Sequence, residues 1–269
     1  MGTRKVDRGG EKSARQALSY SSNNTGLKGI DPMSSIAIVG RGRLGRALFA
    51  ALTKTGATVR GPLGRGESTK RADVVLLCVP EPELAAASAA VRPGPLVGHC
   101  SASASLDLLA PHERFVAHPL MTVTMAGARF TGAVCAIDGS SPRALSAARE
   151  LAQALGMRPI HVPPEHRALY HAAASMASNF LVTLEAAAER LGAACGVDRA
   201  GLAPLVRAAA DNWATLGSAA ALSGPIARGD HLTASRQRAA VAGAAPDLLP
   251  MWDALAGATE VLAAHSRGS

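Results

Sequence analysis

From Ser35 onward, short apolar runs alternate with longer stretches in which apolar residues recur every three or four positions. This alternation predicts strands and helices in turn. Six strands are predicted, at residues 36–39, 57–60, 72–79, 95–99, 114–118 and 132–137, with one helix ending at Gly56 and others at 81–91, 104–110 and 142–156. Short strands that are apolar throughout are typical of a parallel sheet covered by helices on both faces.

The strand pattern stops at Pro163 and Pro164, and only helical periodicity follows. A long helix is predicted over residues 165–192, because the two prolines suit a helix start and one apolar stripe runs along the segment. Further helices are predicted near residues 199–216, 231–243 and 247–265. The sequence therefore predicts a doubly wound, mostly parallel α/β domain over residues 34–162, followed by an all-helical domain over residues 163–269.

Composition excludes several classes of protein. The chain has 269 residues, 48% of them hydrophobic and 18% charged, so it can bury a core of ordinary size without a metal or a disulfide. The net charge of +8 comes from scattered cations with only 3% aromatic residues, which does not indicate a nucleic-acid binder. No apolar run is long enough to span a membrane. Residues 1–33 lack the apolar core of a signal peptide and are expected to form a disordered extension.

The four cysteines, at positions 78, 100, 135 and 195, are too far apart for a C-x-x-C pair. We interpret them as buried thiols of a protein from a reducing compartment, so a cytoplasmic location is expected. The histidines form no group with acids or cysteines at metal-ligand spacing, and no metal site is predicted.

A G-x-G-x-x-G pattern lies between the first predicted strand and the helix that follows. In this position the first glycine permits a tight turn, the second admits a diphosphate and the third allows close packing of helix on strand. The amides at the start of the helix then face the phosphates. The alternative is a glycine-rich turn without a ligand. This context predicts a Rossmann-type dinucleotide-binding domain, whose cofactor-binding residues here are Gly40, Arg41, Gly42, Arg43, Leu44 and Gly45.

Arginines replace the acidic residue that selects NAD. That residue usually follows the first glycine by about 20 positions and accepts a hydrogen bond from the ribose 2′-hydroxyl. Arg60 occupies this place, Arg65 follows, and Arg41 and Arg43 lie in the glycine turn. Guanidinium groups suit a 2′-phosphate, so NADP(H) is favoured over NAD(H), with Arg60 as a further cofactor-binding residue. The alternative is that these arginines are solvated surface charges.

Several blocks of sequence add a family resemblance. They are VLLCVPEPEL at 75–84, GHCSAS at 98–103, AHPLMT at 117–122, GAVCAIDGS at 132–140, YHAAASMASNFLVTL at 170–184 and LSGPIARGD at 222–230. Together with the glycine turn, they resemble the family of Rossmann-like and DUF2520 domain-containing proteins, over nearly all of residues 34–250. That family is similar in plan to pyrroline-5-carboxylate reductase, ketopantoate reductase, prephenate dehydrogenase and the hydroxyisobutyrate-type dehydrogenases.

The resemblance implies roles for both predicted domains. It places Val79 and Pro80 beside the nicotinamide ribose of NADP. It also implies that residues 163–269 form a DUF2520-like substrate and dimerisation domain, and that the protein is a homodimer. Some members of the family resemble an alternative ketopantoate reductase, which suggests 2-dehydropantoate as a substrate.

Candidate substrate-binding residues follow predicted strands or lie in a glycine-rich segment. Ser101 leaves the fourth strand at its carboxyl end, where α/β sheets place ligand contacts, and offers a hydroxyl to a carboxylate or carbonyl. His118, in a His-Pro-Leu segment similar to a His-Pro-Met turn of prephenate dehydrogenases, ends the fifth strand; a neutral packing histidine is the alternative. Arg228 is expected to contact the substrate or a partner subunit.

The candidate catalytic residues are His171, Ser175 and Asn179, which are spaced to lie on one face of the long predicted helix. Related dehydrogenases carry a lysine and an asparagine on the corresponding helix, and the lysine transfers a proton. This chain has no lysine after Lys70, so His171 is the available substitute. The alternative is a polar seam in a dimer interface.

These observations favour an NADPH-dependent reductase of a small 2-oxo acid, with 2-dehydropantoate as the best named candidate. One alternative is a dehydrogenase or reductase of the prephenate or pyrroline-carboxylate type. Another is a protein that binds NADP without catalysis, which the missing lysine would fit. In each case the expected partners are a small molecule and a second copy of the chain.

Overall fold

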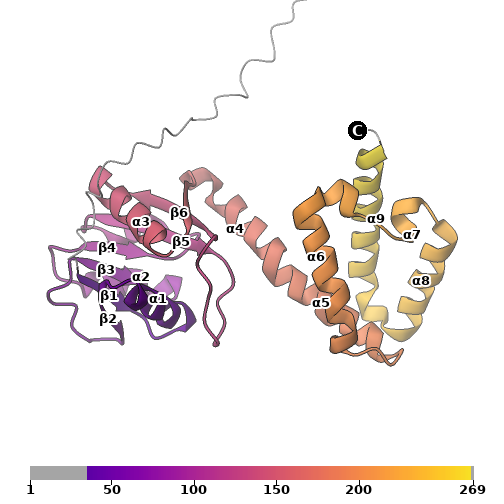
Figure 1. Cartoon of the computed structure of the whole chain (residues 1–269), viewed down its shortest axis with the longest axis horizontal. Coiled ribbons are helices and arrows are strands. Elements are labelled where there is room, and N and C mark those ends of the chain that lie inside the picture. Colours follow the sequence, from indigo (N-terminus) through magenta and orange to yellow (C-terminus); the bar gives the residue numbers. More distant parts are fainter. Residues whose placement is uncertain (1–34, 268–269) are drawn as a thin grey trace, which may run out of the picture. The chain divides into compact units, whose positions relative to one another are not determined.

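The computed structural model describes residues 35–267. The chain divides between Pro164 and Glu165 into two compact units, the first holding the strands and the second built of helices (Figure 1). The extension predicted over residues 1–33 lies outside the described residues, as does residue 34.

The first unit is built on a seven-stranded sheet with the strand order β2-β1-β3-β4-β5-β6-β7. Neighbouring strands run parallel except for β5 and β6, which are antiparallel. The predicted Rossmann-type, mostly parallel sheet is therefore confirmed. Its strands are β1 (Ser35–Val39), β2 (Thr58–Leu63), β3 (Val74–Leu77), β4 (Leu96–His99), β5 (Arg114–Leu120), β6 (Val134–Gly139) and β7 (Arg158–His161).

Helices cover both faces of this sheet because successive strand side chains point to opposite faces. Ile36 and Ile38 of β1 belong to a buried cluster with α1 (Arg43–Lys54) and α3 (Pro142–Ala154), whereas Ala37 belongs to a second cluster with α2 (Leu84–Ala89). Helix α1 follows β1, α2 follows β3, and the two strands are neighbours. The chain thus leaves adjacent strands toward opposite faces, and this reversal opens a crevice at their carboxyl ends.

Two elements of the first unit differ from the prediction. The short edge strand β7 was not predicted, because its four residues include Pro159, which an edge strand tolerates. The helix predicted over residues 104–110 is a 3₁₀ turn, Leu106–Leu109, capped by the Ser105 hydroxyl.

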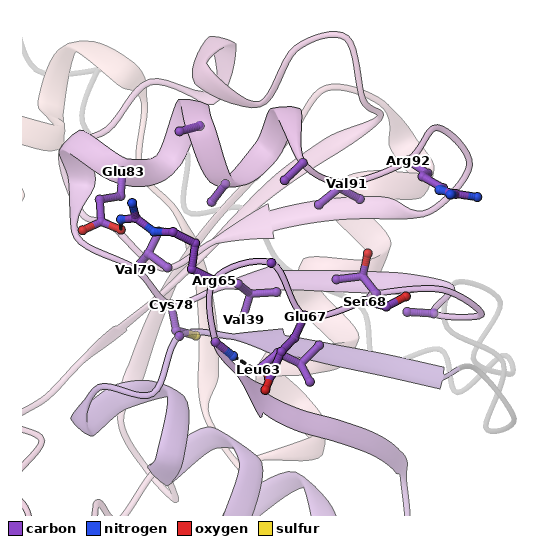
Figure 2. Close-up of a pocket in the computed structure, with 18 of the residues that line it drawn as sticks. Val39, Leu63, Arg65, Glu67, Ser68, Cys78, Val79, Glu83, Val91 and Arg92 are labelled. Carbon is purple, nitrogen blue, oxygen red and sulfur yellow. Dashed lines mark hydrogen bonds and ion pairs between the residues drawn. The ribbon is translucent and has the colours of Figure 1, made fainter.

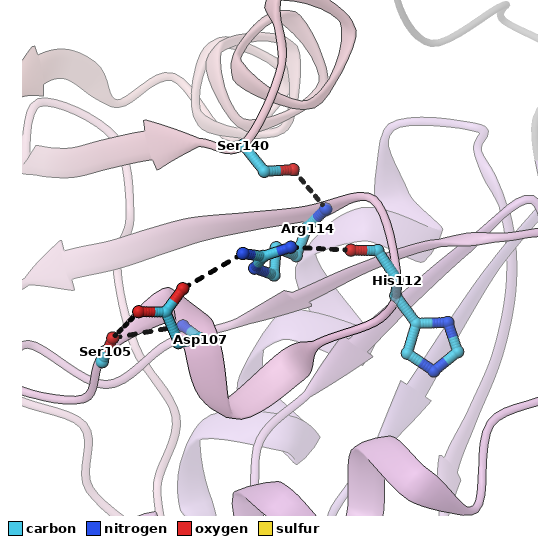
Figure 3. A network of polar contacts seen from close by, with 5 residues as sticks. All are labelled: Ser105, Asp107, His112, Arg114 and Ser140. Carbon is cyan, nitrogen blue, oxygen red and sulfur yellow. Dashed lines mark hydrogen bonds and ion pairs between the residues drawn. The ribbon is translucent and has the colours of Figure 1, made fainter.

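A polar network joins this 3₁₀ turn to the antiparallel pair β5–β6 (Figure 3). The Arg114 guanidinium donates to Asp107 Oδ1 at 3.1 Å and to the His112 carbonyl at 3.3 Å. The Arg114 backbone N–H donates to the Ser140 hydroxyl at 3.0 Å, just beyond β6. Because the Asp107 side chain is 83% exposed, its ion pair with Arg114 contributes little to the free energy of folding. The main effect of the network is to fix the position of the 3₁₀ turn relative to β5 and β6.

The regular secondary structure of the second unit, within its described residues, is all helical, but the predicted long helix is interrupted. Helix α4 (Arg167–Ser175) passes through a π-helical turn, Met176–Phe180, into α5 (Leu181–Ala193). Then come α6 (Arg199–Ala221), α7 (Pro225–Arg228), α8 (His231–Ala244) and α9 (Leu249–Arg267). The single turn α7 lies in the glycine-rich segment between Gly224 and Gly229, and Asp230 caps α8 by accepting a hydrogen bond from the Thr233 N–H at 3.0 Å.

Large apolar side chains remain exposed on this second unit. Among its described residues, only alanines and one valine fall in the buried class, namely Ala187, Val241, Ala245 and Ala263. Met176, Phe180, Trp213 and Leu205, in contrast, are each more than 60% exposed. Contiguous exposed apolar surface marks interaction sites in other proteins, and these side chains are the candidates for such a surface here.

Three cysteines belong to the core of the first unit. Cys100 and Cys135 are buried in the cluster that contains α1 and α3, and Cys78 packs against it. Burial raises the pKa of the Cys135 thiol to about 12, and a hydrogen bond with Cys78, together with burial, raises the pKa of Cys100. Cys195, in the second unit, is exposed. The described cysteines are free thiols, and all but Cys195 are at least half-buried.

We expect Gly98→Ala to destabilise the first unit by about 1–3 kcal/mol, because a side chain there overpacks the core. Gly98 pairs with Phe115 across β4 and β5, and an added Cβ would lie 2.3 Å from the ring. The exposed helical Gly243→Ala has no neighbour within 4 Å and should be neutral or stabilising in the same thermal unfolding assay. Equal effects of the two substitutions would contradict this packing.

We expect iodoacetamide at pH 8 to modify Cys195 first and to leave Cys100 and Cys135 unmodified in the native protein. The thiolate is the reactive form, and raised pKa values leave little of it at this pH. Peptide mass spectrometry measures the order, with the urea-unfolded chain as the control in which all four cysteines react. Native-state modification of Cys135 as fast as Cys195 would contradict its burial.

Candidate dinucleotide site

A cleft of about 1080 Å³ opens at the carboxyl ends of β1 and β3, where the chain leaves the two strands toward opposite faces (Figure 2). One wall is the glycine turn, Gly40–Gly42, and the turn Cys78–Pro80 follows β3. The other wall comes from segment 63–72, which connects β2 to β3 without a helix, and from α2 with the residues beyond it. The predicted cofactor-binding residues Gly40, Arg41, Gly42, Val79 and Pro80 thus lie together along one cleft.

Glycine is present at each of the three positions of the turn for a different structural reason. Gly40 has φ +120°, and a Cβ there would lie 2.2 Å from the Cys78 carbonyl oxygen. A Cβ on Gly45 would lie 2.0 Å from the Gly40 carbonyl oxygen, so α1 can approach the turn only if residue 45 is glycine. Gly42 precedes α1 and has no atom near the position of a Cβ, so the start of the helix is open. An open helix start with unobstructed amides is suited to a phosphate group.

Arg41 and Glu67 form an ion pair in the wall of the cleft. Arg41 Nη2 donates to Glu67 Oε1 at 2.6 Å, and the Gly64 N–H donates to Glu67 Oε2 at 2.7 Å. The hydrogen bond from Gly64, followed by the charge and the hydrogen bond of Arg41, lowers the pKa of Glu67. An added Cβ on Gly64 would lie 3.2 Å from the Arg41 guanidinium carbon. Glycine at position 64 therefore lets this guanidinium lie close to the backbone.

The other predicted arginines differ in position. Arg60 donates to the backbone carbonyls of Ser68 and Lys70 and so braces the segment that lines the cleft. Arg65 lies in the cleft wall and pairs with Glu83 at 2.9 Å, as Figure 2 shows. Arg43 is exposed on the first turn of α1.

Leu44, next in the predicted set, is half-buried and packs against the core. Like Arg43, Gly45 and Arg60, it is outside the lining of the cleft. Direct cofactor contact by these residues stays a prediction.

A second polar group lies just beyond the carboxyl ends of β3 and β4. Glu81 Oε2 accepts hydrogen bonds from the hydroxyls of Ser101, at 2.9 Å, and Ser103, at 2.8 Å. The buried His99 accepts the Ser101 N–H at Nδ1 over 3.1 Å. These bonds fix the direction of the Ser101 side chain, which the sequence predicts to contact substrate. Glu81 adds a negative charge to this end of the sheet.

One predicted substrate-binding residue of the first unit remains, His118. His118 is half-buried on β5, where it pairs with Ala136 of β6.

Within residues 35–267, no group of three or more His, Cys, Asp or Glu side chains is arranged to hold a metal ion. No helix in that same range is both long and apolar enough to cross a membrane.

The predicted catalytic residues lie in the second unit, around the π-helical turn. His171 is exposed on α4, Ser175 ends that helix half-buried, and Asn179 is exposed within the turn. A π turn takes more residues than an α turn, so Asn179 is rotated away from the straight line that the spacing predicts. Such turns are frequent at functional sites. Arg228 is exposed at the end of α7.

Sequence reasoning missed the acidic residues of both polar groups. Glu67 and Glu81 are separated from their partners by 26 and 20 positions, so no local pattern relates them. The available signal was the segment Gly64-Arg65-Gly66-Glu67 directly after β2, whose glycines indicate a turn at the place where dinucleotide folds select their cofactor.

Comparisons with known proteins agree with this fold. Residues 133–259 match the family described as "Domain of unknown function (DUF2520)". No curated protein matches the chain in sequence.

Several solved structures have a fold similar to that of this chain. A Bacteroides fragilis protein, provisionally described as an NADP oxidoreductase, is 18% identical, with a TM-score of 0.73 over 85% of this chain and 98% of its own. The 1-pyrroline-5-carboxylate reductase of Streptococcus pyogenes is 14% identical, with a TM-score of 0.57 over 86% and 100%. A reductive aminase of Aspergillus terreus, in complex with NADPH and ethyl-5-oxohexanoate, is 17% identical, with a TM-score of 0.58 over 88% and 96%.

At these identities the structural likeness establishes the fold. The resemblance inferred from the sequence blocks is confirmed by the family match and by these structures. The chain has a Rossmann-type fold, and the match to the DUF2520 family covers residues 133–259, from the start of β6 in the first unit into α9 of the second.

Proposed function

We propose that this protein is an NADPH-dependent reductase of small carbonyl compounds, with a 2-oxo acid as substrate and 2-dehydropantoate as the best named candidate. The observation that carries the proposal is the glycine turn, which presents an unobstructed helix start to a cleft that also contains the Arg41 guanidinium. The NADP oxidoreductase description of one structural neighbour and the NADPH bound to another support the choice of cofactor.

The residues of the cleft fit the parts of this cofactor. Amides of Gly40–Gly42 and the start of α1 would hold the diphosphate, since backbone amides and the helix dipole favour anions. Arg41 and Arg65, on the walls of the cleft, would face the 2′-phosphate, and Arg60 would support the same wall. Val79 and Pro80 follow β3 and would border the nicotinamide ribose.

NADPH, when bound, supplies the hydride. The chain must then hold the carbonyl compound and deliver a proton to its oxygen. We assign the proton to His171, because an imidazolium can release a proton near neutral pH and no lysine follows Lys70. Ser175 and Asn179 are proposed to orient the carbonyl, and Ser101, His118 and Arg228 to bind the carboxylate.

A second candidate substrate is a cyclic or substituted imine. The Glu81 carboxylate at the carboxyl ends of β3 and β4 favours a cationic iminium over a carboxylate at that place. Two structural neighbours, a pyrroline-5-carboxylate reductase and a reductive aminase, are consistent with this chemistry. Binding of NADP without catalysis is the remaining alternative, and turnover separates it from both.

A homodimer in the cytoplasm completes the proposal. The exposed apolar side chains of the second unit, including Phe180 and Trp213, are the surface that a second copy would cover. The free thiols of the described cysteines are consistent with a reducing compartment.

The direct test is NADPH oxidation, followed at 340 nm, with 2-dehydropantoate, other 2-oxo acids and pyrroline-type imines. We expect His171→Ala to lower kcat roughly 10²-fold or more, as loss of a general acid does, and His231→Ala on α8 to leave it unchanged.

Gly42→Ala should raise the Kd for NADPH at least about tenfold, because its methyl group enters the open helix start. Absence of NADPH binding would refute the proposal, and binding without turnover would leave only the non-catalytic alternative.

We expect sedimentation to show a dimer at micromolar concentration, and Phe180→Asp to shift it toward monomer. A charge at a buried apolar contact costs several kcal/mol unless it is paired. The matched substitution Met125→Asp, on an exposed residue of the first unit, should leave the dimer intact. A wild-type protein that sediments as a monomer at all accessible concentrations would contradict the dimer.

A further inference from the structure

We propose that the Glu67 carboxylate occupies the position of the cofactor's 2′-phosphate in the unliganded protein, and that NADPH binds by displacing it. This inference rests on the proposed function, because it assigns one residue of the same cleft a specific effect on cofactor choice. Glu67 then acts as an internal competitor that weakens the binding of 2′-phosphorylated nucleotides and leaves other adenine nucleotides unaffected.

Two hydrogen-bond donors hold the Glu67 carboxylate. Its two carboxylate oxygens accept from the Arg41 guanidinium at 2.6 Å and from the Gly64 N–H at 2.7 Å. A guanidinium beside a backbone amide at the end of β2 is the donor set that a phosphate monoester would require there. The carboxylate side chain already satisfies these donors, so the site holds an anion before any nucleotide arrives.

The surroundings of Glu67 favour an anion. The pKa of Glu67 is lowered first by the Gly64 hydrogen bond, then by Arg41, and also by the charge of Arg60. The same positive surroundings that favour this carboxylate would favour a phosphate in its place. A phosphate beside the remaining carboxylate would be repelled, so the two anions cannot share the site without cost.

The Glu67 side chain is free to move away from Arg41 and Gly64. Its side chain is 44% exposed, and the turn that carries it contains Gly66 at φ +78° between Gly64 and Glu67. The only backbone bond across this turn is a long one, from the Glu67 N–H to the Gly64 carbonyl at 3.3 Å. An exposed ion pair on such a turn is weak, so its displacement should cost a factor of about five in affinity rather than block binding.

A different role for Glu67 predicts the opposite result. A carboxylate near the end of β2 can accept a hydrogen bond from the ribose 2′-hydroxyl, which selects NAD(H). Removal of its charge would then weaken NADH and AMP and would not strengthen a 2′-phosphorylated ligand. One substitution, Glu67→Gln, therefore separates a competitor from a ribose acceptor by the sign of its effect.

The test is calorimetric titration of the full chain with adenosine 2′,5′-bisphosphate and with AMP, which differ only in the 2′-phosphate. Glu67→Gln should lower the Kd for the bisphosphate about fivefold and leave the Kd for AMP unchanged. The control is Asp253→Asn, which removes a 2.8 Å ion pair with Arg238 in the second unit. The Asp253 side chain is 44% exposed, as that of Glu67 is. Asp253→Asn should change neither Kd.

A double-mutant cycle identifies the partner. In an Arg41→Ala background the gain from Glu67→Gln should disappear, because the competitor and the phosphate use the same guanidinium. An unchanged bisphosphate Kd in Glu67→Gln, or weaker AMP binding, would overturn this inference while NADPH binding by the wild type upheld the proposed function. Failure of the wild type to bind NADPH and bisphosphate alike would instead overturn both.

Discussion

The structure of the first unit depends on the close approach of the glycine turn to the end of β3. A Cβ on Gly40 would lie 2.2 Å from the Cys78 carbonyl oxygen, and a Cβ on Gly45 would lie 2.0 Å from the Gly40 carbonyl oxygen. Only glycines at both positions allow β1, the turn and α1 to pack in this way. This packing directs the start of α1 toward the crevice at the carboxyl ends of β1 and β3, and the cleft exists because of it.

The arginines that the sequence assigns to the cofactor have protein partners at the cleft and in the segment behind it. Arg41 pairs with Glu67, Arg65 pairs with Glu83, and Arg60 donates to two backbone carbonyls. Under the proposed function, Arg41 and Arg65 would each exchange a protein partner for a ligand oxygen when NADPH binds. Cofactor affinity then depends on the difference between two sets of contacts, so the number of arginines alone does not predict it.

The sequence predicted those features that depend on local patterns. The spacing of Gly40, Gly42 and Gly45 after an apolar strand predicted the turn. Gly40 and Gly45 have steric reasons within a few residues or at the end of one neighbouring strand, and Gly42 leaves the helix start open. Features set by distant partners were not accessible: the Pro159-containing edge strand β7 exists only by pairing with β6, and Glu67 meets Arg41 across 26 positions. The π turn at Met176–Phe180 was missed because an α-helical stripe does not reveal one inserted residue.

We propose that the glycine turn and the Arg41 site together bind the phosphates of NADPH, and a crystal structure of the full chain with NADPH is the decisive measurement. We expect the diphosphate against the amides at Gly42, the 2′-phosphate on Arg41, and Glu67 turned away from its present partners. A nucleotide bound elsewhere on the chain, with the glycine turn empty, would contradict it.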